Sequence, residues 1–181
     1  MTGREKLKLI NRPHPEPVEG GGRPLAVAAT LLAVIIASPA LAQPAPLELR
    51  LADVARFAVF VDMTSVQWTG RTAKLRLLQV TEGGFKAGAD EYWGGWRHEV
   101  IDCEARTISH AGFASIRTGG REGPVTGDPR PPVAIPAGSA DEAAARVVCD
   151  GWKPFAGVAV ATSLEQAVGL ARPLIETGAE P

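Results

Sequence analysis

The chain carries two cysteines, Cys103 and Cys149, and a bond between them would restrict the possible folds more than any other feature. An even number of cysteines in an exported chain predicts a disulfide. This bond would close a loop of about 46 residues and, in the chain-entropy model, stabilise the fold by about 4 kcal/mol. A catalytic thiol would need a neighbouring base, and a zinc site would need closely paired ligands, so the sequence favours the disulfide.

Export is predicted by the segment that precedes the folded part. Residues 25–37, LAVAATLLAVIIA, are apolar and uncharged, and Ala40-Leu41-Ala42 follows them closely. A basic lead, a short apolar core and small residues before the cut are typical of a secretory signal peptide. We therefore expect a signal peptide with an extended n-region over residues 1–42, and cleavage between Ala42 and Gln43.

A membrane anchor is the alternative interpretation of the same apolar run. A spanning helix needs about 20 apolar residues, whereas this run is shorter and Pro39 follows it. Gln43 also stands where a lipoprotein would need the cysteine that takes the lipid. The sequence therefore predicts a protein of the periplasm or a secreted protein, with no stable membrane anchor after cleavage.

The charge of the mature part argues against nucleic acid as a partner. The chain has 19 basic and 20 acidic residues, of which five and three lie in residues 1–42, so residues 43–181 carry a net charge of −3. Both signs are scattered, whereas binding to phosphates requires a basic face.

The middle of the chain shows strand patterns. In Thr72–Val80 the apolar Ala73, Leu75 and Leu77 alternate with other residues, which is typical of a strand with one buried face. We expect further strands over Ala58–Asp62, over Glu91–Cys103 and over Thr107–Ile116. Met63–Trp68 either continues the first of these strands or forms a short partner for it.

A segment rich in proline and glycine, Thr118–Gly138, follows the strands and is expected to form a loop. Ser139 and Glu142 then form a capping box that begins a helix, and Gly151 is suited to its C-terminal end. At 100° per residue, Cys149 falls opposite the apolar stripe of this helix. Either the helix frays near Cys149, or the bridge approaches from a side other than the main core contact.

A second helix is predicted over Thr162–Leu170, with Thr162 and Glu165 as its capping box and Pro173 as its end. The expected organisation is a flexible lead over 43–56, a β domain over 57–151, and a C-terminal extension over 152–181, partly helical and then disordered. The expected class is α+β, an antiparallel β-sheet of about five to six strands with a C-terminal helix clamped by one disulfide.

Short motifs over Phe57–Cys149 resemble the surface-adhesin protein E family of small exported bacterial proteins. They are listed here in chain order: Val59-Phe60-Val61-Asp62, Thr64-Ser65-Val66, Lys74–Leu78, Cys103-Glu104-Ala105-Arg106, Ile135-Pro136-Ala137-Gly138-Ser139 and Val147-Val148-Cys149. The resemblance implies an antiparallel sheet of about six strands and a helix clamped to it by the disulfide. Adhesion, the named function of the family, is not carried over, because Gln43 replaces the cysteine of the family's lipid anchor.

Three aromatic residues, Tyr92, Trp93 and Trp96, form the candidate binding patch. Aromatic side chains beside glycines can provide a platform for a sugar or a peptide. The alternative is that they fill the core or cover a sheet edge, and we favour it, because a small sheet with few phenylalanines needs large apolar side chains.

The remaining candidates are weaker. His98 and His110 lie on neighbouring strands and could face each other, but two isolated histidines do not make the three or four ligands of a typical metal site, so we expect no metal and no cofactor. Asp62 could cap the following turn or pair with an arginine. The familiar catalytic motifs are missing from the sequence, and we expect no catalytic residues.

These observations favour a non-catalytic binding or interaction protein of the cell envelope, whose partner is an unknown protein, peptide or envelope component. A hydrolase with an unrecognised site is the first alternative. A purely structural envelope protein, which could form a homodimer through a sheet edge, is the second. An enzyme should show a pocket with convergent polar groups, whereas a binding module should show an exposed aromatic patch or an open sheet edge.

Overall fold

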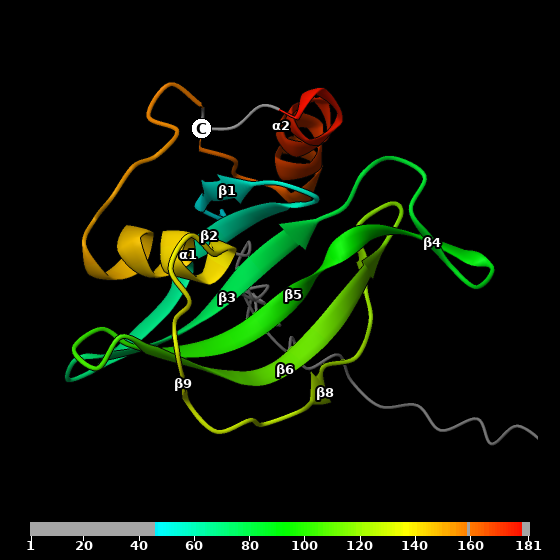
Figure 1. Cartoon of the computed structure of the whole chain (residues 1–181). Helices are drawn as coiled ribbons and strands as arrows, with labels where there is room; N and C mark the ends of the chain where they lie inside the picture. Colours follow the sequence, from blue (N-terminus) through cyan, green and yellow to red (C-terminus); the bar gives the residue numbers. More distant parts are fainter. Residues whose placement is uncertain (1–45, 159, 179–181) are drawn as a thin grey trace, which may run out of the picture. The chain divides into compact units, whose positions relative to one another are not determined.

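The computed structural model describes residues 46–158 and 160–178. The predicted signal peptide and the junction between Ala42 and Gln43 lie outside the described residues. The described part is an α+β protein, as predicted, with one mostly antiparallel sheet and two helices (Figure 1). The strands are β1 Leu49–Val54, β2 Ala58–Thr69, β3 Thr72–Val80, β4 Lys86–Ala87, β5 Asp90–Asp102, β6 Thr107–Arg117, β7 Arg121–Glu122, β8 Thr126–Gly127 and β9 Val133–Ala134, and the helices are α1 Ala140–Cys149 and α2 Leu164–Thr177.

The sheet is an antiparallel meander in the order β1-β2-β3-β5-β6-β7. β3 occupies the residues that its alternating pattern predicts, and it pairs with β2 on one side and with β5 on the other. Short connections between sequential strands favour this arrangement, since neighbouring strands can pair through tight turns. In Figure 1 the four long strands β2, β3, β5 and β6 lie side by side.

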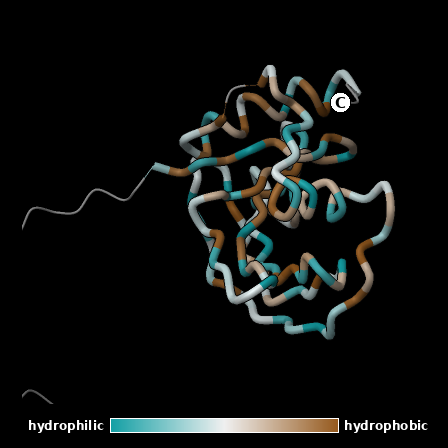
Figure 2. The backbone as a smooth tube through the Cα atoms, turned by 90° about the vertical axis from the view of Figure 1, so that its left-hand side faces the viewer, coloured by the Kyte–Doolittle hydropathy of each residue, from teal (hydrophilic) through white to brown (hydrophobic). Residues whose placement is uncertain are grey.

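The sheet is apolar on both faces, and a different helix covers each face. In β2, Phe60 packs in one core cluster while Val59 and Val61 pack in another, because successive side chains of a strand point to opposite faces. The α2-side core contains Phe60, Leu78, Val80, Trp96, Ile116, Ala167, Val168 and Ala171. The α1-side core contains Val59, Val61, Leu75, Leu77, Ile101, Ala144, Val147 and Val148. The most hydrophobic stretches, brown in Figure 2, lie largely in the interior.

β1 lies within the stretch that the sequence assigned to a flexible lead, and here the structure corrects the assignment. Residues Leu49–Val54 form an edge strand paired with β2. Leu49 and Leu51 are buried on either side of the half-buried Arg50, which is the period-2 pattern of a strand. The alternating pattern is too short to be recognised in the sequence. The burial of this strand depends on α2 and on residues far along the chain.

The proline-rich segment forms no long strand, as expected, but it covers the outer edge of β6. The two-residue strands β7, β8 and β9 pair with β6 in turn. Between them, Gly123 N donates to Ser115 O at 2.7 Å, and Arg130 N donates to His110 O at 2.9 Å. Prolines are tolerated at a sheet edge because their missing N–H groups can face away from the ladder.

α1 begins and ends as the sequence predicts. Glu142 N donates to Ser139 Oγ at 3.1 Å, and Gly138 N donates to the Glu142 carboxylate at 2.7 Å. Gly151, at φ +66°, follows the last turn. Cys149 is the last helical residue, so the helix does not fray before it. The half-buried Cys149 is bonded to Cys103 with a Cα–Cα distance of 5.6 Å, so the bridge approaches α1 beside its most buried stripe.

α2 differs from the prediction at both ends. Its N-cap is Ser163 rather than Thr162, with Gln166 N donating to Ser163 Oγ and Thr162 N donating to Gln166 Oε1. Pro173 does not end the helix, which continues to Thr177. Pro173 is exposed, and the carbonyl four residues earlier belongs to the exposed Gly169, so water can hydrate the group that loses its hydrogen bond.

The continuation of α2 past Pro173 brings Leu174 and Ile175 against the α2-side core. Their burial offsets the cost of the lost backbone hydrogen bond.

Within the described residues, neither helix has the length and apolarity that crossing a bilayer requires.

Breaking the disulfide should lower the free energy of unfolding by about 4 kcal/mol, because the bond restricts the unfolded chain over 46 residues. Urea denaturation followed by circular dichroism, with and without reductant, measures this difference. The double variant Cys103→Ser, Cys149→Ser should match the reduced protein and be insensitive to reductant. A wild-type midpoint that reductant leaves unchanged would contradict a stabilising bond.

Candidate functional site

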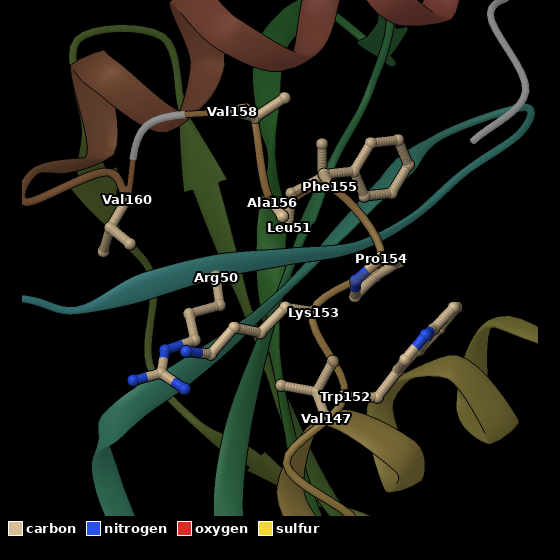
Figure 3. Close-up of a pocket in the computed structure, with 10 residues that line it drawn as sticks. All are labelled: Arg50, Leu51, Val147, Trp152, Lys153, Pro154, Phe155, Ala156, Val158 and Val160. Carbon is tan, nitrogen blue, oxygen red and sulfur yellow. The ribbon is translucent and has the colours of Figure 1, made fainter.

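A groove runs along β1 on the side where the chain returns from α1 to α2. It is lined by Arg50 and Leu51 of β1, Val147 of α1, and residues 152–156, 158 and 160 of the connecting segment, and its volume is about 260 Å³ (Figure 3). We call it the β1 groove. Most of its lining side chains are aliphatic or aromatic, so it offers an apolar ligand a partly desolvated surface.

One end of the connecting segment is anchored to α1. Asp150 N and Trp152 N both donate to Arg146 O, at 3.0 and 3.1 Å, and the residue between them adopts the left-handed conformation that often follows the end of a helix. Gly151 supplies that conformation. The turn places the Trp152 ring 3.8 Å from the Arg146 guanidinium, a cation–π contact, and Cys149 lies just before it.

The other end of the segment is anchored to β1. Leu49 N donates to Ala161 O at 2.9 Å, and Ala161 N donates to Leu49 O at 3.1 Å. Between the anchors, Val158 N donates to Phe155 O at 2.8 Å, which closes a turn. Because both ends are anchored, the wall of the groove is held near β1, although most of it has no regular secondary structure.

Two cations line the groove, and they differ in their pairing. Arg50 Nε donates to Glu48 Oε1 at 2.8 Å, so one carboxylate compensates this guanidinium. Lys153 is exposed, and within the described residues it makes no ion pair. Figure 3 shows the charged ends of both side chains pointing to the same side of the groove. The groove therefore combines an apolar wall with a local excess of positive charge.

The predicted aromatic patch does not form one surface. Trp96 is 1% exposed in the α2-side core, where its indole N–H donates to Glu122 Oε1 at 2.8 Å and Arg76 lies 4.3 Å from its ring. Trp93 packs against the same core. Tyr92 lines a separate groove. A platform that includes all three rings is thus inconsistent with the structure, because Trp96 fills the core, as the alternative interpretation predicts.

A second groove, the aromatic groove, lies on the part of the sheet around Tyr92, Phe85 and Phe113 and has a volume of about 370 Å³. Phe85 is 36% exposed and Phe113 is 39% exposed. The Phe113 ring lies on Gly95, where an added Cβ would come within 2.1 Å of its Cζ. Glycine at this position is therefore needed for a close contact rather than for a turn.

A buried charged cluster joins the sheet to the first turn of α1. Glu99 is 1% exposed, and its Oε1 accepts from Arg97 Nε at 2.9 Å and contacts His110 Nδ1 at 3.0 Å. Arg97 Nη2 also donates to Asp141 of α1 at 2.7 Å. Burial alone lowers the pKa of Arg97, but the neighbouring Asp141 and Glu99 carboxylates raise the pKa above its ordinary value. This cluster joins the sheet to α1.

The two histidines do not face each other, contrary to the possibility raised by the sequence. His110 is paired with Glu99, whereas His98 is paired with Gly112, and adjacent residues of β5 point to opposite faces. No group of three or more potential metal ligands is assembled within the described residues.

Asp62 pairs with an arginine, as one of its two predicted roles requires, but it caps no turn, because β2 continues past it to Thr69. Its buried carboxylate accepts from Thr64 N at 3.1 Å, within the irregular stretch of β2, and from Arg76 Nη2 at 2.6 Å. The same Arg76 covers the Trp96 ring. Asp62 therefore holds local backbone and core together, and its place is structural.

No sequence pattern indicates the β1 groove. Its residues come from a strand, a helix end and an irregular segment, and only the fold brings these together. The apolar Phe155, Val158 and Val160 between Trp152 and Ala161 were the one available signal, since a connecting segment that rich in apolar residues must lie against something.

Comparison with known proteins yields a likeness of fold. A structure of Haemophilus influenzae protein E in crystal form II aligns with 62% of this chain and 98% of its own, with 10% identity and a TM-score of 0.45. A second structure of the same protein aligns with 61% and 93%, with 8% identity and a TM-score of 0.42. No protein-family model and no curated protein matches the chain. Nothing about either groove follows from likenesses this distant.

Removal of Arg97 should strongly destabilise the protein, because it leaves the Glu99 carboxylate buried without its main cation. We expect Arg97→Ala to lower the free energy of unfolding by about 3 kcal/mol, measured by urea denaturation. Arg71→Ala is the matched control, since Arg71 pairs with Glu104 in an exposed ion pair; it should cost well under about 1 kcal/mol. Equal losses in the two variants would contradict the role of the cluster.

The protein should lose stability in mild acid partly through His98. Burial lowers the pKa of His98 below its ordinary value of 6.5, and the nearby Arg76 and Lys74 lower the pKa further. The unfolded chain therefore binds this proton more readily, so stability falls as the pH drops through 6.5 and towards the folded pKa. His98→Gln should lose less stability than wild type between about pH 7.5 and about pH 5 in urea titrations; an equal loss would contradict the assignment.

Proposed function

We propose that this chain is an exported, non-catalytic binding protein of the cell envelope that holds its ligand in the β1 groove. The observation that carries the proposal is a groove of about 260 Å³ whose irregular wall is anchored at both ends, to α1 and to β1. A binding site needs a surface that is formed before the ligand arrives, since ordering a loose segment reduces affinity.

The disulfide supports the exported location. Disulfides persist in the periplasm and outside the cell and are rare in a reducing cytoplasm. The Cys103–Cys149 bond joins the β5–β6 turn to the end of α1, just before the groove wall. Together with the signal peptide predicted for residues 1–42, this bond favours function in an oxidising compartment.

The chemistry of the lining supports binding rather than catalysis. Among the ten described residues that line the groove, none has a carboxylate, an imidazole, a thiol or a hydroxyl group. General acid–base and nucleophilic catalysis use these groups in most hydrolases. The titratable side chains of the lining are Arg50 and Lys153, which are suited to attract a negative charge.

The proposal is tested with protein taken from the periplasm of an exporting host, where mass spectrometry should find a chain that begins at Gln43 and contains the disulfide. The neutral fluorescent probe N-phenyl-1-naphthylamine should bind it with a stoichiometry of one. Ala156→Trp should fill the groove and weaken binding about tenfold. Ala105→Trp, the same change in the exposed β5–β6 turn, is the control and should bind like wild type.

A catalytic assay separates the hydrolase alternative. The neutral ester p-nitrophenyl decanoate should be hydrolysed no faster with the protein than in buffer alone. Hydrolysis that the purified protein accelerates would overturn the non-catalytic proposal. Probe binding that Ala156→Trp and Ala105→Trp leave equally unchanged would overturn the assignment of the site to the β1 groove.

A further inference from the structure

The distribution of charge in the β1 groove indicates which ligand it would accept. Arg50 and Lys153 lie on the same side of the groove, and their charged ends point the same way (Figure 3). Glu48 compensates Arg50 alone. The remaining positive charge is unbalanced among the described lining residues, and a carboxylate would balance it through charge-assisted hydrogen bonds.

The apolar lining defines the rest of the ligand. Leu51, Val147, Phe155, Val158 and Val160 provide aliphatic and aromatic surface. Apart from the indole of Trp152, the lining has no uncharged polar side chain. An extended peptide carries an amide at every residue, and each amide that loses water without gaining a partner costs free energy. An acyl chain carries no such groups, so the aliphatic and aromatic side chains of the lining can cover it without leaving a polar group of the ligand unpaired.

We infer that the β1 groove binds a single acyl chain that ends in a carboxylate, with the chain along the apolar wall and the carboxylate at Lys153 and Arg50. This inference rests on the proposed function and adds the class of ligand. A volume of about 260 Å³ suits a medium-length chain rather than a two-chain lipid. Lys153 and Arg50 would be specificity-determining residues, because an alcohol or an ester of the same chain would lack the charge they recognise.

The test compares decanoate with decanol, which have the same chain and differ in charge, both below the concentration at which they aggregate. Isothermal titration calorimetry at low salt should show that Lys153→Glu weakens decanoate binding about tenfold and leaves decanol binding unchanged. Lys153→Arg should keep most of the affinity for decanoate. Lys86→Glu, the same change of net charge on the exposed β4, is the matched control and should leave both ligands unaffected.

The outcomes separate this inference from the proposed function. If Ala156→Trp weakens the binding of decanol, the groove is a binding site. If, in addition, Lys153→Glu weakens the binding of decanoate no more than Lys86→Glu does, the inference about the carboxylate is overturned. If neither ligand binds wild type although N-phenyl-1-naphthylamine does, the acyl-chain inference is overturned and the proposed function stands; if the probe does not bind either, both proposals fail. If the peptide acetyl-Val-Leu-Phe with a free C-terminus binds more tightly than decanoate, and its amide does not, the ligand is a peptide terminus and the acyl chain is overturned.

Discussion

The bond between Cys103 and Cys149 fixes the position of the end of α1, and the rest of the C-terminal chain continues from there. Cys103 follows β5, and its N–H donates to Arg71 O, so it is already tied to the turn between β2 and β3. Cys149 is the last residue of α1. The bond therefore holds the end of α1 at one end of the sheet, where the next residues must return along β1. The groove wall begins three residues after Cys149, with Trp152 stacked on Arg146.

A sheet that is apolar on both faces explains why two helices are needed. A strand with one buried face leaves the other to water, but β2 is buried over Ala58–Asp62 on both faces. α1 covers one face and is tied to it by the disulfide and by the cluster around Glu99. α2 covers the other face through Ala167, Val168 and Ala171, without a covalent link. The segment between the helices must cross the edge of the sheet to reach the second face, and β1 is that edge.

Short sequence patterns were sufficient to predict the elements that depend on neighbouring residues alone. The alternation of β3, the capping box at Ser139 and the proline-rich edge all follow from the backbone preferences of a few neighbouring residues. The predictions of helix and strand boundaries were wrong where tertiary packing overrides such preferences. Pro173 lies inside α2 because the burial of Leu174 and Ile175 outweighs one lost hydrogen bond, and no local rule includes that burial.

The dependence on tertiary packing also explains why the sequence indicated one candidate binding site wrongly and the other not at all. The aromatic run was visible in the sequence, yet the register shift between Tyr92 and Gly94 interrupts the alternation of β5, so that Trp96 is buried and Tyr92 lines a groove. The β1 groove was invisible because its two cations lie about a hundred residues apart, Arg50 in the first strand and Lys153 beyond α1. A constraint that brings distant segments together creates a site only after the chain has folded. In this chain that constraint is the disulfide-bound end of α1, which returns the chain to the edge strand from which it started.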